Sequence, residues 1–176
     1  VYDGSVYGKI VAEKTQLALN NLGTKEIVFQ EINSNSSHYA EQLKHISDLK
    51  PDLVYFGGLH VDAGNVLKYL REHGNQTAFF GSDGIASPDF VQAAGGPSNV
   101  KDVYMAFFND PLSIPEAKKV VKALEAKWIK PSVYLLNAYA AVHAVAAALT
   151  NTPRDKMSDC LHHNKEDSVI GTWERD

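Results

Sequence analysis

The chain has 176 residues, 44% of them hydrophobic and 22% charged, which is the composition of an ordinary soluble globular domain. Its formal net charge is −4 and its basic residues are scattered, which excludes the basic face that supplies most affinity for nucleic acid. The single cysteine, Cys160, excludes an internal disulfide and a zinc site built from several cysteines.

The amino-terminal part predicts a helix followed by a strand and a second helix. Residues 1–4 look like the end of a strand, and Ser5 is a candidate N-cap of a helix that ends at Gly23. A short strand is predicted over 26–32. The next helix spans 39–49, with Ser36 or Ser37 as its candidate cap and Pro51 at its end.

The stretch 51–64 is the centre of the predicted fold. Its run Leu-Val-Tyr-Phe, residues 53–56, is typical of a strand that is buried on both faces. Gly57 and Gly58 then allow a sharp turn, and apolar residues recur at helical spacing from Val66 onward. The turn therefore lies at the carboxyl end of a parallel strand, where open α/β sheets bind ligands.

The rest of the chain continues the alternation of strands and helices. The predicted strands cover 79–80, 103–107 and 169–173, and the predicted helices cover 88–95, a segment from Pro115 to residue 124, 133–149 and 153–161. Ser87, directly before Pro88, is the candidate cap of the helix over 88–95. This order predicts an α/β fold, a Rossmann-like or flavodoxin-like parallel sheet flanked by helices. Because both ends look like strands, we expect the chain to be a piece of a longer protein.

The helix predicted over 133–149 is apolar enough to raise the question of a membrane span. Its length is at the lower limit for spanning a bilayer, Asn137 and His143 interrupt it, and alanine contributes little apolar area. We therefore favour a buried helix that packs closely on its neighbours and requires a large partner surface.

Motifs for catalysis, metals and cofactors are missing from the sequence. The seven histidines match no metal-binding pattern, and no nucleophile elbow, phosphate-binding loop or G-x-G-x-x-G sequence occurs. Nothing near Cys160 in the sequence would activate it as a nucleophile. We therefore expect a protein that is not an enzyme, with no cofactor and no metal.

Three loops that follow predicted parallel strands carry polar or aromatic side chains. They contribute Ser5 and Tyr7, then Leu59, His60 and Asp62, then Ser82 and Asp83. If the strands are neighbours, these side chains converge on one rim of the sheet, where an aromatic ring beside a carboxylate suits an ammonium group. The alternative, in which Asp83 only caps a turn and Tyr7 only packs on the first helix, stays open.

Five motifs, in order along nearly the whole chain, resemble the type I periplasmic binding proteins, above all the leucine/isoleucine/valine-binding proteins of ABC importers. Residues 3–9 (DGSVYGK) resemble the family's D-x-x-x-Y-G, and 52–58 (DLVYFGG) its D-x-V-Y-Y-G-G. The others are 80–84 (FGSDG), similar to F-x-G-x-E-G, 139–142 (YAAV) and 169–171 (VIG). Each motif alone is short, but the ordered set is specific.

The resemblance implies a two-lobe venus-flytrap fold that closes on a ligand at a hinge. It implies that residues 1–130 form the second, ligand-binding lobe and that 131–176 return to pack on a first lobe absent from this sequence. Tyr7 falls on the family's cleft tyrosine, and Asp83 falls where the family has the glutamate that pairs with the ligand ammonium. Ser82 and His60 would lie on the same rim.

Two positions depart from the family pattern. Asp83 is one methylene shorter than the family's glutamate, and Leu59 stands where the family has a second cleft tyrosine. The resemblance thus implies binding of an amino acid, branched-chain or related, without implying that leucine, isoleucine or valine is the ligand. An amide, a urea-like solute or an aromatic acid stays open.

The leading hypothesis is a solute-binding component of an ABC importer, with an amino acid and a permease as partners. The alternatives are a ligand sensor or receptor ectodomain of the same fold and an enzyme of flavodoxin-like or Rossmann-like topology. The resemblance implies a periplasmic or extracellular location, with a lipidated amino terminus as a possible tether. Because the surface over 133–149 would lack its first-lobe partner, we expect a homodimer through that helix.

Overall fold

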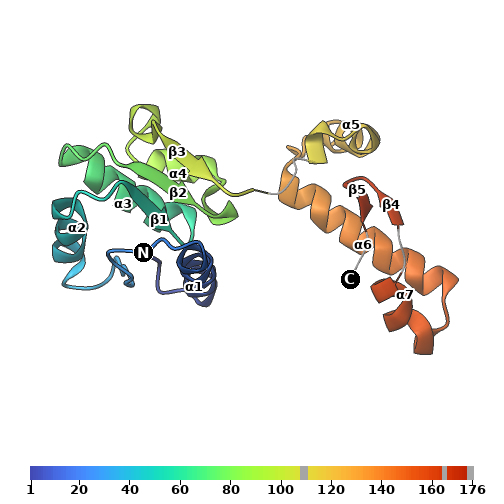
Figure 1. Cartoon of the computed structure of the whole chain (residues 1–176). Helices are drawn as coiled ribbons and strands as arrows, with labels where there is room; N and C mark the ends of the chain where they lie inside the picture. The colour runs from blue at the N-terminus through green and yellow to red at the C-terminus, as the bar shows by residue number, and fades with distance from the viewer. Residues whose placement is uncertain (108–110, 164–165, 174–176) are drawn as a thin grey trace. The chain divides into compact units, whose positions relative to one another are not determined.

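The structure is a computed structural model that describes residues 1–107, 111–163 and 166–173 (Figure 1). The chain forms two compact units, Val1–Phe108 and Asn109–Asp176, and each is described separately below. The boundary that we predict near residue 130 divides the chain by function rather than by compactness, and it stays a prediction.

The first unit alternates helices and strands as the sequence predicts. Its elements are α1 (Val6–Asn21), α2 (Tyr39–Asp48), β1 (Leu53–Phe56), α3 (His60–Glu72), β2 (Ala78–Gly81), α4 (Pro88–Ala93) and β3 (Val103–Met105), with 3-10 turns at Asp83–Ile85 and Pro97–Val100. Ser5 caps α1 by accepting a hydrogen bond from the Gly8 amide, and Ser87 caps α4 through the Asp89 amide. Both predicted caps are confirmed.

The sheet is parallel and has the strand order of a flavodoxin-like fold. β1, β2 and β3 are adjacent and parallel, with Leu53 opposite Ala78 and Phe79 opposite Val103. Tyr2 forms single parallel bridges to Glu31 on one side and to Gly57 on the other. With these two bridged segments counted as strands, the order across the sheet is the segment of Glu31, the segment of Tyr2, β1, β2 and β3. Numbered by position along the chain, this is 2-1-3-4-5, which is the flavodoxin-like order.

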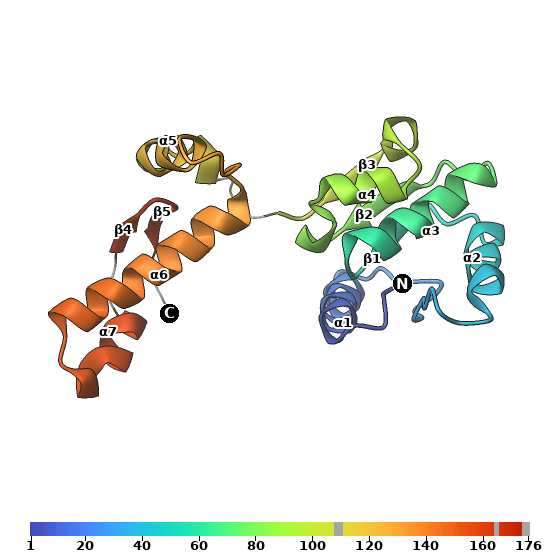
Figure 2. The same cartoon turned by 180° about the vertical axis from the view of Figure 1, so that it is seen from behind.

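The two faces of the sheet bury different side chains. On one face Val54, Phe56 and Phe79 join the core, and the rings of Phe56 and Phe79 stack at 6.2 Å. Helices α3 and α4 cover this face, as Figure 2 shows from behind. On the other face the rings of Tyr55 and Phe80 stack at 6.1 Å. The sheet is therefore fixed by aromatic pairs on both faces.

Two sequence expectations between residues 26 and 48 are wrong. The strand predicted over 26–32 is reduced to the single bridge at Glu31, because only residues 1–3 lie beside this segment to pair with it. Helix α2 begins at Tyr39 with His38 as its N-cap, and no side chain caps it. Ser36 instead accepts a hydrogen bond from the His38 amide, and it lies two residues before the N-cap position.

Within its described residues, the second unit contains three helices and a hairpin. They are α5 (Lys118–Glu125), α6 (Val133–Asn151), α7 (Met157–His163), β4 (Glu166–Ser168) and β5 (Gly171–Trp173), with 3-10 turns at Pro111–Ser113, Pro115–Ala117 and Arg154–Lys156. The strand predicted over 169–173 starts only at Gly171, because residues 169–170 turn the chain so that β5 pairs antiparallel with β4. In the first unit, β3 likewise ends at Met105 rather than at the predicted residue 107.

Helix α6 buries a stripe of small residues. Leu136, Ala140, Ala144 and Ala148, spaced by four, are buried, whereas Val142 on another face is 70% exposed. Among the residues that the structure describes, α6 is the one helix whose length and composition would allow it to cross a bilayer.

Arg71 of α3 joins the helix to the loops that precede β2 and β3. Its side chain is only 8% exposed and donates hydrogen bonds to four backbone carbonyl oxygens. The acceptors belong to Asn75 at 2.9 Å, Thr77 at 3.0 Å, Lys101 at 3.1 Å and Asn99 at 3.3 Å. Burial lowers the pKa of the guanidinium from its usual value. One cation thus satisfies carbonyl groups that the loops leave without strand partners.

Replacing Arg71 by methionine should destabilise the first unit by about 3 kcal/mol, because buried carbonyl groups lose their donors. The matched change Lys68→Met on the same helix removes only an exposed ion pair to Glu72 and should cost less than about 0.5 kcal/mol. Urea unfolding followed by far-ultraviolet circular dichroism measures the stability of both variants. Tryptophan fluorescence is unsuitable, because Trp128 and Trp173 lie in the second unit. Equal midpoints for the two variants would contradict the role of Arg71.

Candidate functional site

Three loops meet at the carboxyl edge of the sheet in the first unit. The switch point of the flavodoxin-like order lies between the segment of Tyr2 and β1, and this is where such sheets form a ligand crevice. The loops that leave this edge are 3–5, before α1, 57–59, before α3, and residue 82, before the 3-10 turn at Asp83. The sequence therefore places its polar loop residues at the predicted edge.

Asp3 ties the first of these loops to the second. The residue is 5% exposed, and its carboxylate accepts hydrogen bonds from the Ser5 amide at 3.0 Å, from the Ser5 hydroxyl and from the Leu59 amide at 2.8 Å. The Asp3 amide also donates to the carbonyl oxygen of Gly57 at 2.9 Å. Asp3 thereby holds the start of α1 against the amino end of α3.

Close backbone contacts explain why glycine occupies this edge. A Cβ atom added to Gly84 would lie 2.3 Å from the carbonyl oxygen of Gly58, and one added to Gly57 would lie 2.5 Å from that of Gly8. Gly58 itself has a φ of 150°, and its added Cβ would lie 2.3 Å from a carboxylate oxygen of Asp3. The three loops therefore touch through their backbones, with no room for side chains between them.

Tyr7, Ser82 and Asp83 form one hydrogen-bonded cluster. The Tyr7 hydroxyl lies 2.6 Å from Oδ1 of Asp83 and 2.9 Å from Oγ of Ser82. Because the phenol has one proton and the carboxylate only accepts, Tyr7 donates to Asp83 and the Ser82 hydroxyl donates to the Tyr7 oxygen. Partial burial, followed by the hydrogen bond to Asp83, raises the pKa of Tyr7 above its usual value.

Leu59 and His60 lie at the amino end of α3 but point to different surroundings. Leu59 is the N-cap residue, its amide is bonded to Asp3, and its side chain is 48% exposed. Nε2 of His60 lies 3.8 Å from Oδ2 of Asp89 in α4. Of the five predicted site residues, Tyr7, Ser82 and Asp83 are in direct contact, Leu59 is joined to their edge through Asp3, and His60 faces α4.

Sequence reasoning missed Asp3, the buried carboxylate that positions this edge. An aspartate two residues before a helix N-cap is the signal that identifies it, since its side chain bonds to the backbone two residues on. Among the described residues, no group of three or more histidine, cysteine, aspartate and glutamate side chains is placed to hold a metal ion. The half-buried Cys160 receives a hydrogen bond from the Thr152 hydroxyl at 3.3 Å.

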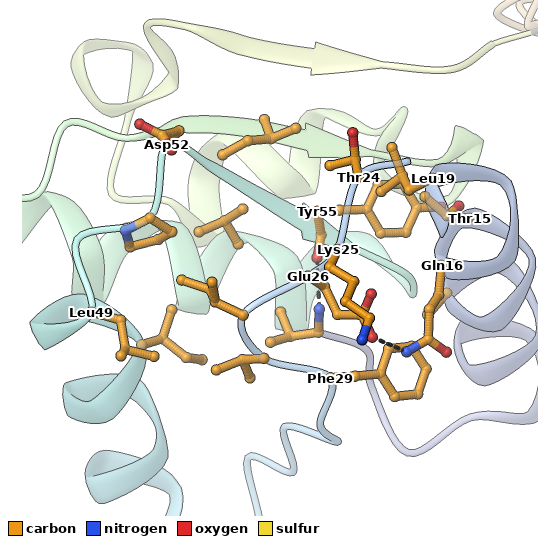
Figure 3. A pocket seen from close by; sticks show the side chains of 18 residues that line it. Thr15, Gln16, Leu19, Thr24, Lys25, Glu26, Phe29, Leu49, Asp52 and Tyr55 are labelled. Atoms are coloured by element: carbon orange, nitrogen blue, oxygen red, sulfur yellow. Dashed lines mark hydrogen bonds between the residues drawn. The ribbon is translucent and has the colours of Figure 1, made fainter. Parts of the chain in front are cut away.

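A cavity of about 290 Å³ lies elsewhere, beside the beginning of β1 (Figure 3). Its lining comes from α1, the segment 24–29, the end of α2 and residues 51–55. None of the five predicted site residues contributes to it.

Residues 1–174 match the family model described as periplasmic binding protein. The chain belongs to the periplasmic binding protein family. An amino acid binding protein of Pseudomonas aeruginosa is 33% identical over 180 residues, covering 100% of this chain and 48% of the relative. Leu/Ile/Val-binding protein homolog 1 of Brucella melitensis is 31% identical over 175 residues, covering 97% of this chain and 47% of the relative.

Solved structures agree with the fold. The chain superposes with a TM-score of 0.80 on the branched-chain amino acid transporter substrate binding protein LivJ of Streptococcus pneumoniae in complex with isoleucine, at 22% identity over 99% of this chain and 51% of that one. A putative branched-chain amino acid ABC transporter protein of Rhodospirillum rubrum gives 0.78 at 25% identity, over 99% and 52% of the two chains.

The membership of the periplasmic binding protein family and the α/β fold class, both predicted from the sequence, are therefore confirmed. The chain spans about half the length of the curated relatives it matches. Its first unit carries the parallel sheet, with the candidate site at its carboxyl edge.

Replacing Asp3 by alanine should lower the stability of the first unit by about 3 kcal/mol, since three donors lose a buried charged acceptor. Asp3→Asn should cost somewhat less, because its side chain keeps one oxygen that accepts hydrogen bonds, although its amide nitrogen then faces a donor. As a control, Asp52→Ala removes an exposed carboxylate and should change stability by less than about 0.5 kcal/mol. Hydrogen exchange across 57–60 is the readout. Unchanged protection in Asp3→Ala would contradict the account.

Proposed function

We propose that the longer protein binds an amino acid, branched-chain or related, and that this sheet edge forms one wall of its cleft. The observation that carries the proposal is the cluster of Tyr7, Ser82 and Asp83 at the switch point of the sheet. The names of the relatives support it, since one is an amino acid binding protein and a structural neighbour contains isoleucine.

In this proposal Asp83 pairs with the ammonium group of the ligand. A carboxylate that already accepts one hydrogen bond from Tyr7 is held in a fixed orientation, so little side-chain entropy is lost when the ligand binds. Tyr7 presents an aromatic ring beside that charge, and aromatic rings attract ammonium groups. Because aspartate is shorter than the family's glutamate, the ligand must approach the 3-10 turn at Asp83–Ile85 more closely.

Leu59 is proposed to shape the part of the cleft that receives the ligand side chain. It is half exposed at the N-cap of α3, and it has neither the hydroxyl nor the ring of the tyrosine that the family has there. An apolar, smaller residue favours an apolar or bulkier ligand group at this point. Ser82 and His60 are proposed to complete the rim.

The leading biological role is that of a solute-binding component of an ABC importer. It would act without catalysis, outside the cytoplasmic membrane, and present its ligand to a permease when the lobes close. Family membership and the transporter relatives support this role. A sensor or receptor ectodomain of the same fold is the second candidate. A lipid-attachment cysteine after an export signal in the longer protein would favour the importer.

The homodimer through 133–149 stays a prediction. Tyr134, Tyr139, Val142, Val145 and Leu149 of α6 are all between 42% and 70% exposed, and apolar surfaces of this kind promote association. Light scattering of the chain at high concentration should give twice the mass of one copy, and Val142→Glu should shift it toward one copy. A single-copy mass for the unchanged chain at every concentration would contradict the dimer.

Replacing Asp83 by asparagine in the longer protein should weaken amino acid binding by roughly 10- to 100-fold, the loss of a charge-assisted hydrogen bond of about 1.5–3 kcal/mol. Isothermal titration with leucine, isoleucine, valine and phenylalanine measures the effect. Deaminated analogues of the same acids should not lose affinity in this variant, because they carry no ammonium group.

The matched control is Asp48→Asn, which removes an exposed carboxylate that pairs with Lys44 on α2. It should leave the affinity unchanged. If Asp83→Asn binds the amino acids as tightly as the control does, Asp83 is not the ammonium partner.

A further inference from the structure

Helix α5 of the second unit is followed by a turn that exposes large apolar side chains. Trp128 is 98% exposed, more than any other large hydrophobic residue that the structure describes, and Ile129 beside it is 43% exposed. A tryptophan that is almost fully exposed adds little packing to its own unit. The burial of this side chain therefore does not explain why the turn contains it.

The backbone of the turn does not favour tryptophan either. The Trp128 amide donates to the carbonyl oxygen of Glu125 at 2.9 Å, and the Ile129 amide donates to that of Leu124 at 3.0 Å. These two bonds form the Schellman pattern, in which the position of Trp128 is usually glycine. Trp128 has a φ of 59°, a conformation that is strained for a bulky side chain. Backbone strain of this kind persists at functional sites.

Lysines surround this tryptophan in the sequence. Residues 118–130 contain five of the 17 lysines and arginines of the chain, all of them lysine, and Glu125 is the one acidic residue in this range. The cluster is a local exception to the scatter of basic residues along the rest of the chain. All five lysines are exposed: Lys118, Lys119, Lys122, Lys127 and Lys130.

Helix α5 separates its charges from its apolar side chains. Val120, Val121 and Leu124 are half-buried, whereas the three lysines of the helix are exposed. Two of these lysines, Lys118 and Lys119, lie in the first turn, where the helix dipole disfavours positive charge. The lysines of α5 thus face solvent in an arrangement that the stability of the helix does not require.

We propose that α5 and the turn after it, residues 118–130, form a surface that docks on an anionic lipid bilayer. The lysines lie near the negatively charged headgroups, and each adds an attraction that is short in range and sensitive to salt. Trp128 enters the headgroup level, where tryptophan side chains are enriched in membrane proteins. We call residues 118–130 the α5 surface.

The composition of the α5 surface favours a bilayer over a protein partner. Protein interfaces are depleted in lysine and enriched in arginine, whose planar group binds carboxylates through two parallel hydrogen bonds. The α5 surface has five lysines and no arginine. A bilayer presents many phosphate groups without a fixed pattern, so flexible point charges suit it. The contact needs no amino acid ligand, and its test is therefore independent of the proposed function.

The test uses the full chain with Trp173→Phe, which leaves Trp128 as its one tryptophan. Vesicles of phosphatidylglycerol and phosphatidylcholine in equal parts should sediment with the chain and shift the emission of Trp128 to shorter wavelengths. Vesicles of phosphatidylcholine alone should do neither, and added salt should release the chain from the anionic vesicles. A chain that stays in solution with the anionic vesicles at low salt would overturn the proposal.

A matched pair of variants separates the α5 surface from net charge. Lys118→Glu with Lys122→Glu should weaken the binding to anionic vesicles by roughly tenfold or more. Lys14→Glu with Lys101→Glu makes the same change in charge at exposed positions of the first unit and should bind as the unchanged chain does. An equal loss in the two pairs would overturn the proposal, because net charge alone would then explain the binding.

Trp128→Gly separates a membrane contact from a structural role. Glycine suits the φ of this position, so the thermal midpoint of the variant should stay equal or rise, while vesicle sedimentation weakens by about tenfold. Unchanged sedimentation would overturn the role of Trp128. The longer protein should bind the same vesicles. Binding by the 176-residue chain alone would overturn the proposal, since the rest of the longer protein would then cover the α5 surface.

Discussion

The buried carboxylate of Asp3 is the constraint on which the candidate site depends. It bonds to the loop that starts α1 and to the amide at the start of α3, two segments that are more than fifty residues apart in the sequence. A buried carboxylate is tolerated only when donors surround it, and here the donors come from Ser5 and Leu59. Folding the second segment against the first is therefore what satisfies the charge.

The position of the aromatic cluster follows from this junction. Asp3 fixes the start of α1, and Tyr7 lies in the first turn of that helix, from which its hydroxyl reaches Ser82 and Asp83. The glycines at 57, 58 and 84 allow the loops to approach within backbone contact. Hydrogen bonds and close backbone contacts between these loops thus position the groups proposed to meet the ligand.

The sequence predicted the features that follow from local pattern and from the parallel order of the strands. The apolar run of β1, the caps Ser5 and Ser87, and the meeting of Tyr7 with Asp83 all follow from local pattern plus parallel topology. The features that it missed depend on which segment lies beside each residue in the folded chain, and the local pattern does not specify this. Residues 26–32 lack a long enough neighbour to form a strand, β5 pairs with β4 in a hairpin, and His60 turns toward Asp89.

The central claim is that the switch point of this sheet receives the ammonium group of an amino acid. A crystal structure of the longer protein with its bound ligand tests it most directly. The account predicts the ligand nitrogen about 3 Å from a carboxylate oxygen of Asp83, the Tyr7 ring against the ligand, and the bonds of Asp3 unchanged. A ligand whose nitrogen is held by other residues, with Asp83 facing away from it, would contradict the account.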